Sequence, residues 1–114
     1  FTPCMQAMYA QLERDWPHKV EPVVGAPFDP ARIDTWFFHQ ANLRKIEEAA
    51  LALRIPGHKV PTHVAWLGNA SGPSTLMLLD DARRSGRLRQ GALSVFFWIG
   101  GGNGAQCGYS VLAH

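Results

Sequence analysis

The stretch TWFFHQANLRKIEEAALALR, residues 35–54, decides the fold of this chain. Residues 35–39 form a short apolar run rich in β-formers, which predicts a buried strand. Residues 41–54 place apolar side chains at helical spacing, which predicts a helix that Ile55-Pro56-Gly57 ends. A strand followed at once by a helix is typical of layered α/β folds. The apolar positions expected on one face of this helix are Leu43, Ile46, Ala50 and Leu53.

The residues before this stretch predict a helix and then a loop. Residues 3–16 have helical periodicity, and Pro17 is expected to end the helix because proline cannot continue its hydrogen bonds. Residues 20–30 hold Pro22, Gly25, Pro27 and Pro30, a density of breakers that predicts a loop. The apolar positions of the first helix are Met5, Met8, Tyr9, Leu12 and Trp16.

Two more units of the same kind follow the deciding stretch. Residues 60–67 predict a second strand, interrupted early by Pro61. A turn rich in glycine, serine and asparagine follows at 68–74, and a helix is expected over 76–84. Gly86 is expected at the position just past the end of that helix, where glycine is favoured.

The last part of the chain predicts two strands. The run LSVFFWI at 93–99 is wholly apolar, as in strands that are covered on both faces. A glycine loop over 100–104 and a short strand over 109–112 complete the chain. The order α-β-α-β-α-β-β predicts a single α/β domain over residues 1–114, with a sheet between layers of helices.

Composition and charge exclude several classes of protein. The chain has 114 residues, 46% of them hydrophobic, which is typical of a globular domain. Its net charge of +2 comes without a dense basic stripe, so we expect no nucleic-acid partner. We find neither a run long enough to span a membrane nor a signal peptide, and we expect a cytoplasmic protein without a membrane partner. The mild basic excess would suit an acidic protein partner if the basic residues cluster in space.

The two cysteines, Cys4 and Cys107, lie near opposite ends of the sequence and lack metal-ligand spacing. We therefore expect no disulfide framework and no metal site. Cys4 is expected to be structural, and Cys107 to be a small core residue. The core is also expected to hold the tryptophans Trp16, Trp36, Trp66 and Trp98.

Three segments with chemical potential follow predicted strands: 39–42, 68–71 and 100–104. Open α/β sheets bind ligands at this edge. A neutral histidine, His39, and an asparagine amide, Asn69, could together stabilise an enolate oxygen, and glycine N–H groups could form a second oxyanion hole. Structural alternatives stay open: His39 as a core histidine, Asn69 as a helix cap or turn residue, and the glycines as a plain turn.

Four segments resemble the β-ketoacyl-ACP synthase III family. The string His39-Gln40-Ala41-Asn42-Leu43-Arg44 resembles its HQANxR motif, and Gly68-Asn69-Ala70-Ser71-Gly72-Pro73-Ser74 resembles its GNxSxxS motif. Residues 79–87 resemble its LDEAxRxGR helix end, and a glycine-rich loop follows a strand in the same order. The resemblance covers residues 34–114 well and 1–33 in outline. It implies the C-terminal half of a thiolase-like fold, with the nucleophilic Cys in an N-terminal half that this chain lacks.

The resemblance also implies a function and site residues. The family uses a Cys-His-Asn triad to transfer an acyl group from the Cys thioester to the carbanion of a malonyl thioester. His39 and Asn69 match the positions that stabilise the enolate, and Gly101 and Gly102 lie in the loop that lends a backbone N–H to the oxyanion hole. Arg44 matches a basic position for docking acyl carrier protein. No cofactor is implied besides acyl-CoA or acyl-ACP as substrates, and the intact protein is expected to be a homodimer.

The family resemblance leaves other functions open. Phe38 stands where the family commonly has Pro before the catalytic His, and we expect this change to line the acyl pocket. A relative of the same fold could instead form esters or amides in secondary metabolism, with His39 as general base. The chain could also be a non-catalytic partner or fragment, because it begins at Phe1 and lacks the Cys. An isolated half is expected to be inactive and prone to aggregation.

Overall fold

A computed structural model describes residues 2–39, 43–62, 79–86, 88–100 and 106–114. Its elements in chain order are α1 (Thr2–Asp15), η1 (Trp16–Val20), α2 (Glu21–Val24), η2 (Pro30–Arg32), β1 (Thr35–Phe38), α3 (Leu43–Ala52), η3 (Gly57–Lys59), β2 (Leu93–Gly100) and β3 (Gln106–Ala113). Residues 79–84 are also helical.

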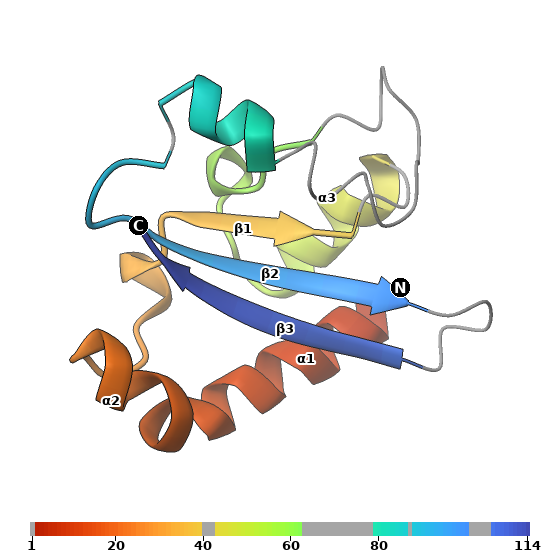
Figure 1. Cartoon of the computed structure of the whole chain (residues 1–114). Helices are drawn as coiled ribbons and strands as arrows, with labels where there is room; N and C mark the ends of the chain where they lie inside the picture. The colour runs from red at the N-terminus through yellow and green to blue at the C-terminus, as the bar shows by residue number, and fades with distance from the viewer. Residues whose placement is uncertain (1, 40–42, 63–78, 87, 101–105) are drawn as a thin grey trace.

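The three described strands form one sheet in the order β1-β2-β3 (Figure 1). β1 runs parallel to β2, with Thr35 opposite Ser94. β2 runs antiparallel to β3, with Phe97 opposite Tyr109. Sequence-distant β1 and β2 are joined at their start by two hydrogen bonds: the Asp34 N–H donates to the Leu93 carbonyl, and the Leu93 N–H donates to the Asp34 carboxylate.

Helices cover both faces of this sheet, which confirms the predicted layers. On one face, α1 and α3 pack on the strands and on each other. On the other face, the helical residues 79–84 bring Ala82 against Phe37 and Phe96. The larger core lies on the α1 and α3 face, and its buried residues are Met5, Met8, Leu12, Trp16, Val20, Ile33, Trp36, Phe38, Ile46, Ala49, Ala50, Ile55, Val60, Val95 and Phe97.

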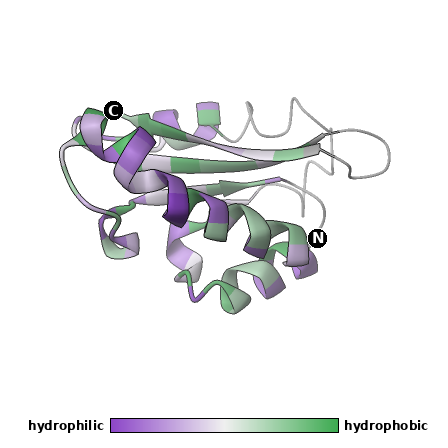
Figure 2. Ribbon diagram, turned by 90° about the horizontal axis from the view of Figure 1, so that it is seen from below, coloured by the Kyte–Doolittle hydropathy of each residue, from purple (hydrophilic) through white to green (hydrophobic). Residues whose placement is uncertain are grey.

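The first helix begins and ends close to the predicted residues, at Thr2 and Asp15, but the chain does not leave the helical conformation at Pro17. Met5, Met8 and Leu12 are buried, three to four residues apart, and Gln6 and Glu13 are exposed. Figure 2 shows hydrophilic and hydrophobic positions alternating along this helix. The chain then widens into the π-helical segment η1, which contains Pro17, and continues into α2. A π turn reaches one residue further than an α turn, so it accommodates a proline that would break the α-helical ladder.

The predicted loop over 20–30 is therefore wrong at its start. Residues 20–24 are helical, and the helix ends at Gly25, whose φ of 76° is the left-handed conformation that glycine adopts without strain. The indole N–H of Trp16 donates to the carbonyl of Ala26 at 2.9 Å, which holds the following loop against the core.

The second half of the chain follows the prediction in part. The predicted strand over 60–67 falls mostly on residues outside the described part, but Val60 follows η3 in a bend, not a strand. Gly86 has a φ of 80° and closes the helical residues 79–84, as predicted. The last strand, β3, starts three residues earlier than the predicted 109.

Burial of β2 confirms that both of its faces are covered. Val95 and Phe97 face the larger core, and Phe96 stacks on Phe37 on the opposite face at 4.5 Å between ring centroids. The prediction for the tryptophans is wrong at Trp98, which is 44% exposed near the end of this strand. Trp16 and Trp36 are core residues, as expected, and Trp66 lies outside the described residues.

Candidate active site at the carboxyl end of the sheet

His39 lies directly after β1, at the carboxyl edge of the two parallel strands. Phe38 pairs with Phe97 in register, and β2 ends at Gly100, so the end of β1 and the start of the glycine run share this edge (Figure 1). Parallel strands place their ligands here because the loops at their carboxyl ends converge. The predicted placement of His39 and of the start of the glycine run is confirmed.

The environment of His39 favours its neutral form. The side chain is half-buried, and this burial lowers the pKa of His39 below the ordinary value of 6.5. A neutral imidazole has one N–H that donates and one nitrogen that accepts a proton. His39 can therefore donate a hydrogen bond to a developing oxyanion or act as a general base at neutral pH.

Arg44 lies in the first turn of α3, the helix that follows His39 in the chain. Its side chain is 89% exposed, and its Nε lies 3.5 Å from a carboxylate oxygen of Glu48, one turn further along. An exposed pair of this kind contributes little stability, so an incoming acidic group could replace Glu48 at small cost. Arg44 therefore lies on the surface, in the first turn of the helix that follows His39 in the chain.

The remaining predicted site residues lie outside the described part of the chain. They are Asn69, Gly101 and Gly102. His39 and Arg44 are therefore the two predicted site residues whose placement is known, and they belong to one strand-helix unit, β1 and α3.

Phe38 occupies the interior and not an open pocket. It is fully buried in the larger core, and its ring stacks on Phe97 at 5.9 Å between centroids. The expectation that the residue before His39 lines an acyl pocket is not met, because alternation along β1 turns Phe38 toward the helices.

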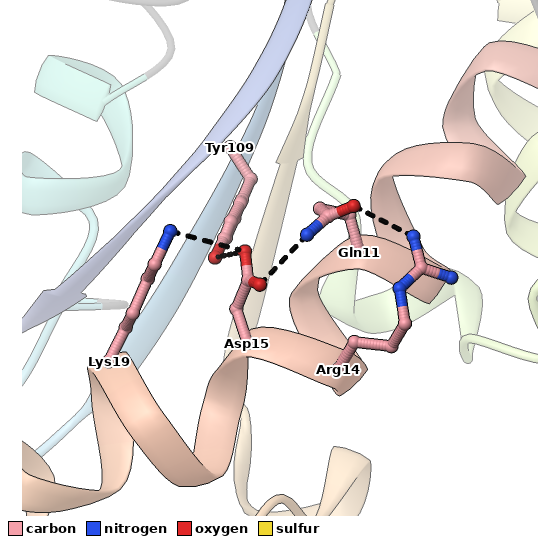
Figure 3. A network of polar contacts seen from close by, with 5 residues as sticks. All are labelled: Gln11, Arg14, Asp15, Lys19 and Tyr109. Carbon is pink, nitrogen blue, oxygen red and sulfur yellow. Dashed lines mark hydrogen bonds and ion pairs between the residues drawn. The ribbon is translucent and has the colours of Figure 1, made fainter.

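A polar network on α1 and β3 was not predicted from the sequence (Figure 3). The hydroxyl of Tyr109 donates to the carboxylate of Asp15 at 2.6 Å, and Gln11 donates to the same carboxylate at 2.8 Å. Lys19 lies 3.8 Å from Asp15, and Arg14 donates to Gln11. Tyr109 and Asp15 lie 94 residues apart in sequence, so no local pattern could reveal this pair. The network joins α1 and η1 to β3.

Within the described residues, none of the helices combines the length and the apolar character of a membrane span. The same residues contain no group of three or more metal-ligand side chains.

Comparison with known proteins decides the family. The sequence profile of the family described as 3-oxoacyl-[acyl-carrier-protein (ACP)] synthase III C terminal matches residues 25–112. The chain belongs to this family.

Individual relatives agree with this assignment. The chain is 36% identical over 90 residues to a β-ketoacyl-[acyl-carrier-protein] synthase III of Lactobacillus delbrueckii subsp. bulgaricus, covering 75% of this chain and 28% of that protein. It is 43% identical over 68 residues to the β-ketoacyl-[acyl-carrier-protein] synthase III 2 of Bacillus anthracis, covering 59% of this chain and 21% of that protein. The chain thus spans under a third of the length of these relatives.

Solved structures show the same fold as this chain. The crystal structure of 3-oxoacyl-[acyl-carrier-protein] synthase III from Aquifex aeolicus superposes with a TM-score of 0.74 and 27% identity, covering 98% of this chain and 35% of that one. The enzyme from Thermus thermophilus superposes with a TM-score of 0.71 and 28% identity, covering 96% and 34%. These likenesses confirm the predicted C-terminal half of a thiolase-like fold.

Proposed function

We propose that this chain is the His- and Asn-bearing part of an acyltransferase that condenses an acyl group with a malonyl thioester in fatty-acid synthesis. The observation that carries the proposal is the half-buried, neutral-favoured His39 at the carboxyl edge of β1, within a chain of the synthase III family. The acyl group would be held on a Cys of the preceding half, and acyl carrier protein or CoA would deliver both substrates.

In the proposed reaction, the chain's own groups stabilise negative charge. Decarboxylation of the malonyl thioester breaks a C–C bond, releases carbon dioxide and leaves the electron pair as an enolate. His39 and Asn69 would each donate a hydrogen bond to the enolate oxygen. The enolate carbon then attacks the acyl thioester, whose oxyanion would receive a backbone N–H from Gly101 or Gly102, and the enzyme thiolate leaves.

The neutral state of His39 matters for this role. A charged imidazolium would lose its hydration on entering the half-buried position, and this cost is what lowers the pKa of His39. A neutral donor keeps the thioester carbonyl from being protonated outright while still stabilising the enolate. The same neutral imidazole could accept a proton from a hydroxyl or amine. The alternative is therefore an ester- or amide-forming reaction, and analysis of the product distinguishes it from condensation.

The experiment separates acyl loading from condensation in the intact enzyme that contains this chain. We expect His39→Ala to leave acylation of the enzyme Cys intact and to slow malonyl decarboxylation and condensation by at least about 100-fold. His18→Ala, an exposed histidine beyond α1, is the matched control and should act as wild type.

The products decide between the proposals. A β-ketoacyl product that carries two malonyl-derived carbons supports condensation. An ester or amide product without malonyl carbon would instead support the alternative acyltransferase. Condensation by His39→Ala at the wild-type rate would show that His39 has no role in the mechanism.

Arg44 is proposed to help dock acyl carrier protein. We expect Arg44→Ala to raise the KM for malonyl-ACP by about tenfold at low salt, with little change for malonyl-CoA, because an exposed charge steers an acidic protein partner. Arg84→Ala is the matched control, since Arg84 forms the same kind of exposed one-turn pair, with Asp80 at 2.9 Å. Equal KM changes for both thioesters would contradict a docking role.

A further inference from the structure

The two cysteines meet in space although they lie far apart in the sequence. Cys107 pairs with Ile99 across β2 and β3, and Ile99 and Tyr109 both pack on the larger core. Alternation along the strand therefore turns Cys107 toward α1. Cys4, in the first turn of α1, packs on the same core, and its thiol is hydrogen-bonded to Cys107.

Other residues of α1 and β3 also lie side by side, which holds Cys4 near Cys107. A pocket of about 450 Å³ is lined by Ala7 and Met8 of α1 and by Trp98, Cys107 and Gly108 of the hairpin. Cys4 lies one helical turn before Ala7 and Met8, on the same side of α1. The hydrogen bond from Tyr109 to Asp15 attaches the next inward-facing residue of β3 to the other end of α1.

The two thiols differ in exposure. Cys107 is exposed at the pocket, whereas Cys4 is half-buried. Burial, and then the hydrogen bond that the Cys4 thiol donates to Cys107, raise the pKa of Cys4 to about 11, so Cys4 stays protonated at neutral pH. Cys107 is therefore the thiol that a small reagent in solution reaches first. The structure corrects the prediction that Cys107 is a core residue, and it brings together cysteines that the sequence kept apart.

We propose that Cys4 and Cys107 are a thiol pair that closes a reversible disulfide between α1 and β3 on reaction with a low-molecular-weight disulfide of the oxidised-glutathione class. This inference concerns the pairing of α1 with β3 and does not rest on the proposed condensation.

The exchange balances in two steps. The Cys107 thiolate attacks one sulfur of the small disulfide, whose S–S bond breaks, and one small thiol leaves while the other half stays bound to Cys107. Cys4 then loses its proton and attacks the Cys107 sulfur, and the second small thiol leaves. The protein loses two electrons and two protons, and the small disulfide gains them.

The pocket beside Cys107 leaves space for the first step. A Cβ at position 108 would lie 2.6 Å from a ring carbon of Trp98, so the indole rests against the bare backbone of Gly108. Cys107 is exposed, and the pocket that it lines together with Ala7 leaves room for a small reagent.

The test oxidises the full chain with oxidised glutathione and blocks free thiols with an alkylating agent before intact-mass analysis. We expect wild type to lose the mass of two hydrogen atoms, to take up no alkylating agent on these cysteines, and to yield one cross-linked peptide joining Cys4 and Cys107. Cys4→Ser should stop at a stable glutathione adduct on Cys107, because the second thiol is missing. Cys107→Ser should react far more slowly than wild type, because Cys4 is half-buried and protonated.

A comparison with unfolded chain keeps the proposal falsifiable if a variant misfolds. We expect wild-type ring closure to be at least about tenfold faster in buffer than in urea, because the fold raises the effective concentration of one thiol at the other. Two stable glutathione adducts on native wild type, a disulfide only between two chains, or equal rates in buffer and urea would each overturn the proposal.

Discussion

β1 and β3 flank the same strand, β2, but they depend on different interactions. All four residues of β1 are buried, with Phe37 on one face and Trp36 and Phe38 on the other. β3 alternates: Tyr109 and Val111 are half-buried against the core, whereas Ser110 and Leu112 are exposed. Side-chain packing on both faces adds to the hydrogen-bonded ladder that holds β1 on β2, whereas β3 has a specific side-chain hydrogen bond to the helix beside it, from Tyr109 to Asp15.

The largest loss of stability is expected when a cavity is made beside β1. Phe37→Ala should lower the free energy of unfolding by about 3–5 kcal/mol, because it empties a fully buried site and removes the stacking on Phe96. Val111→Ala is the matched change on β3 and should cost about 1 kcal/mol, since this side chain is only half-buried. Urea unfolding of both variants measures the contrast, and equal costs would refute it.

A smaller effect is expected where β3 approaches the indole of Trp98. Gly108→Ala should cost about 1–2 kcal/mol, because the new methyl group would overlap the ring and force it outward. In a Trp98→Ala background the same change should cost close to nothing. Thermal unfolding of the two single variants and the double variant gives the coupling, and additive costs would show that the ring does not rest on the glycine.

The smallest effect is expected from the hydrogen bond between Tyr109 and Asp15. Tyr109→Phe should lower Tm by about 4 °C near neutral pH, since it removes one hydrogen bond to a carboxylate. Lys19→Ala, which removes only a 3.8 Å pair with the same carboxylate, is the milder control.

The pH dependence of this bond gives a second measurement. Burial, and then Asp15, raise the pKa of Tyr109 from 10.0 to about 12, so its contribution is fully present below pH 10 and is lost as pH rises through about 12. The Tyr109 hydrogen bond lowers the pKa of Asp15 below 3.8, so that contribution is lost as pH falls below 3.8. The stability difference between wild type and Tyr109→Phe should therefore shrink at both extremes, and a difference independent of pH would contradict the bond.

The same contrast explains what the sequence could reveal. The aromatic run of β1 and the apolar run of β2 predict buried strands, because a strand buried on both faces needs a continuous apolar sequence. The family motifs located His39 at the strand end, and helical periodicity located α1 and α3. Each of these features is encoded within a few neighbouring residues, which is why sequence reasoning reached them.

What escaped prediction depends on partners distant in sequence. The meeting of Cys4 with Cys107 and of Asp15 with Tyr109 is set by how α1 packs across β3, and no local pattern contains that information. Pro17 escaped for another reason: proline usually ends a helix, but a wider π turn absorbs it here. Asn69, Gly101 and Gly102 remain predictions, since they lie outside the described residues.

The pairing of β1 with β2, at Thr35 and Ser94, affects the order in which the chain folds during synthesis. β2 and β3 are neighbours in sequence and can zip together as a hairpin, whereas β1 must wait for β2 to be made. Until then the segment Trp36-Phe37-Phe38 has no strand beside it and is a target for chaperones or for self-association. We therefore expect the rate of productive folding to be set by the docking of β1 on a hairpin that has already formed.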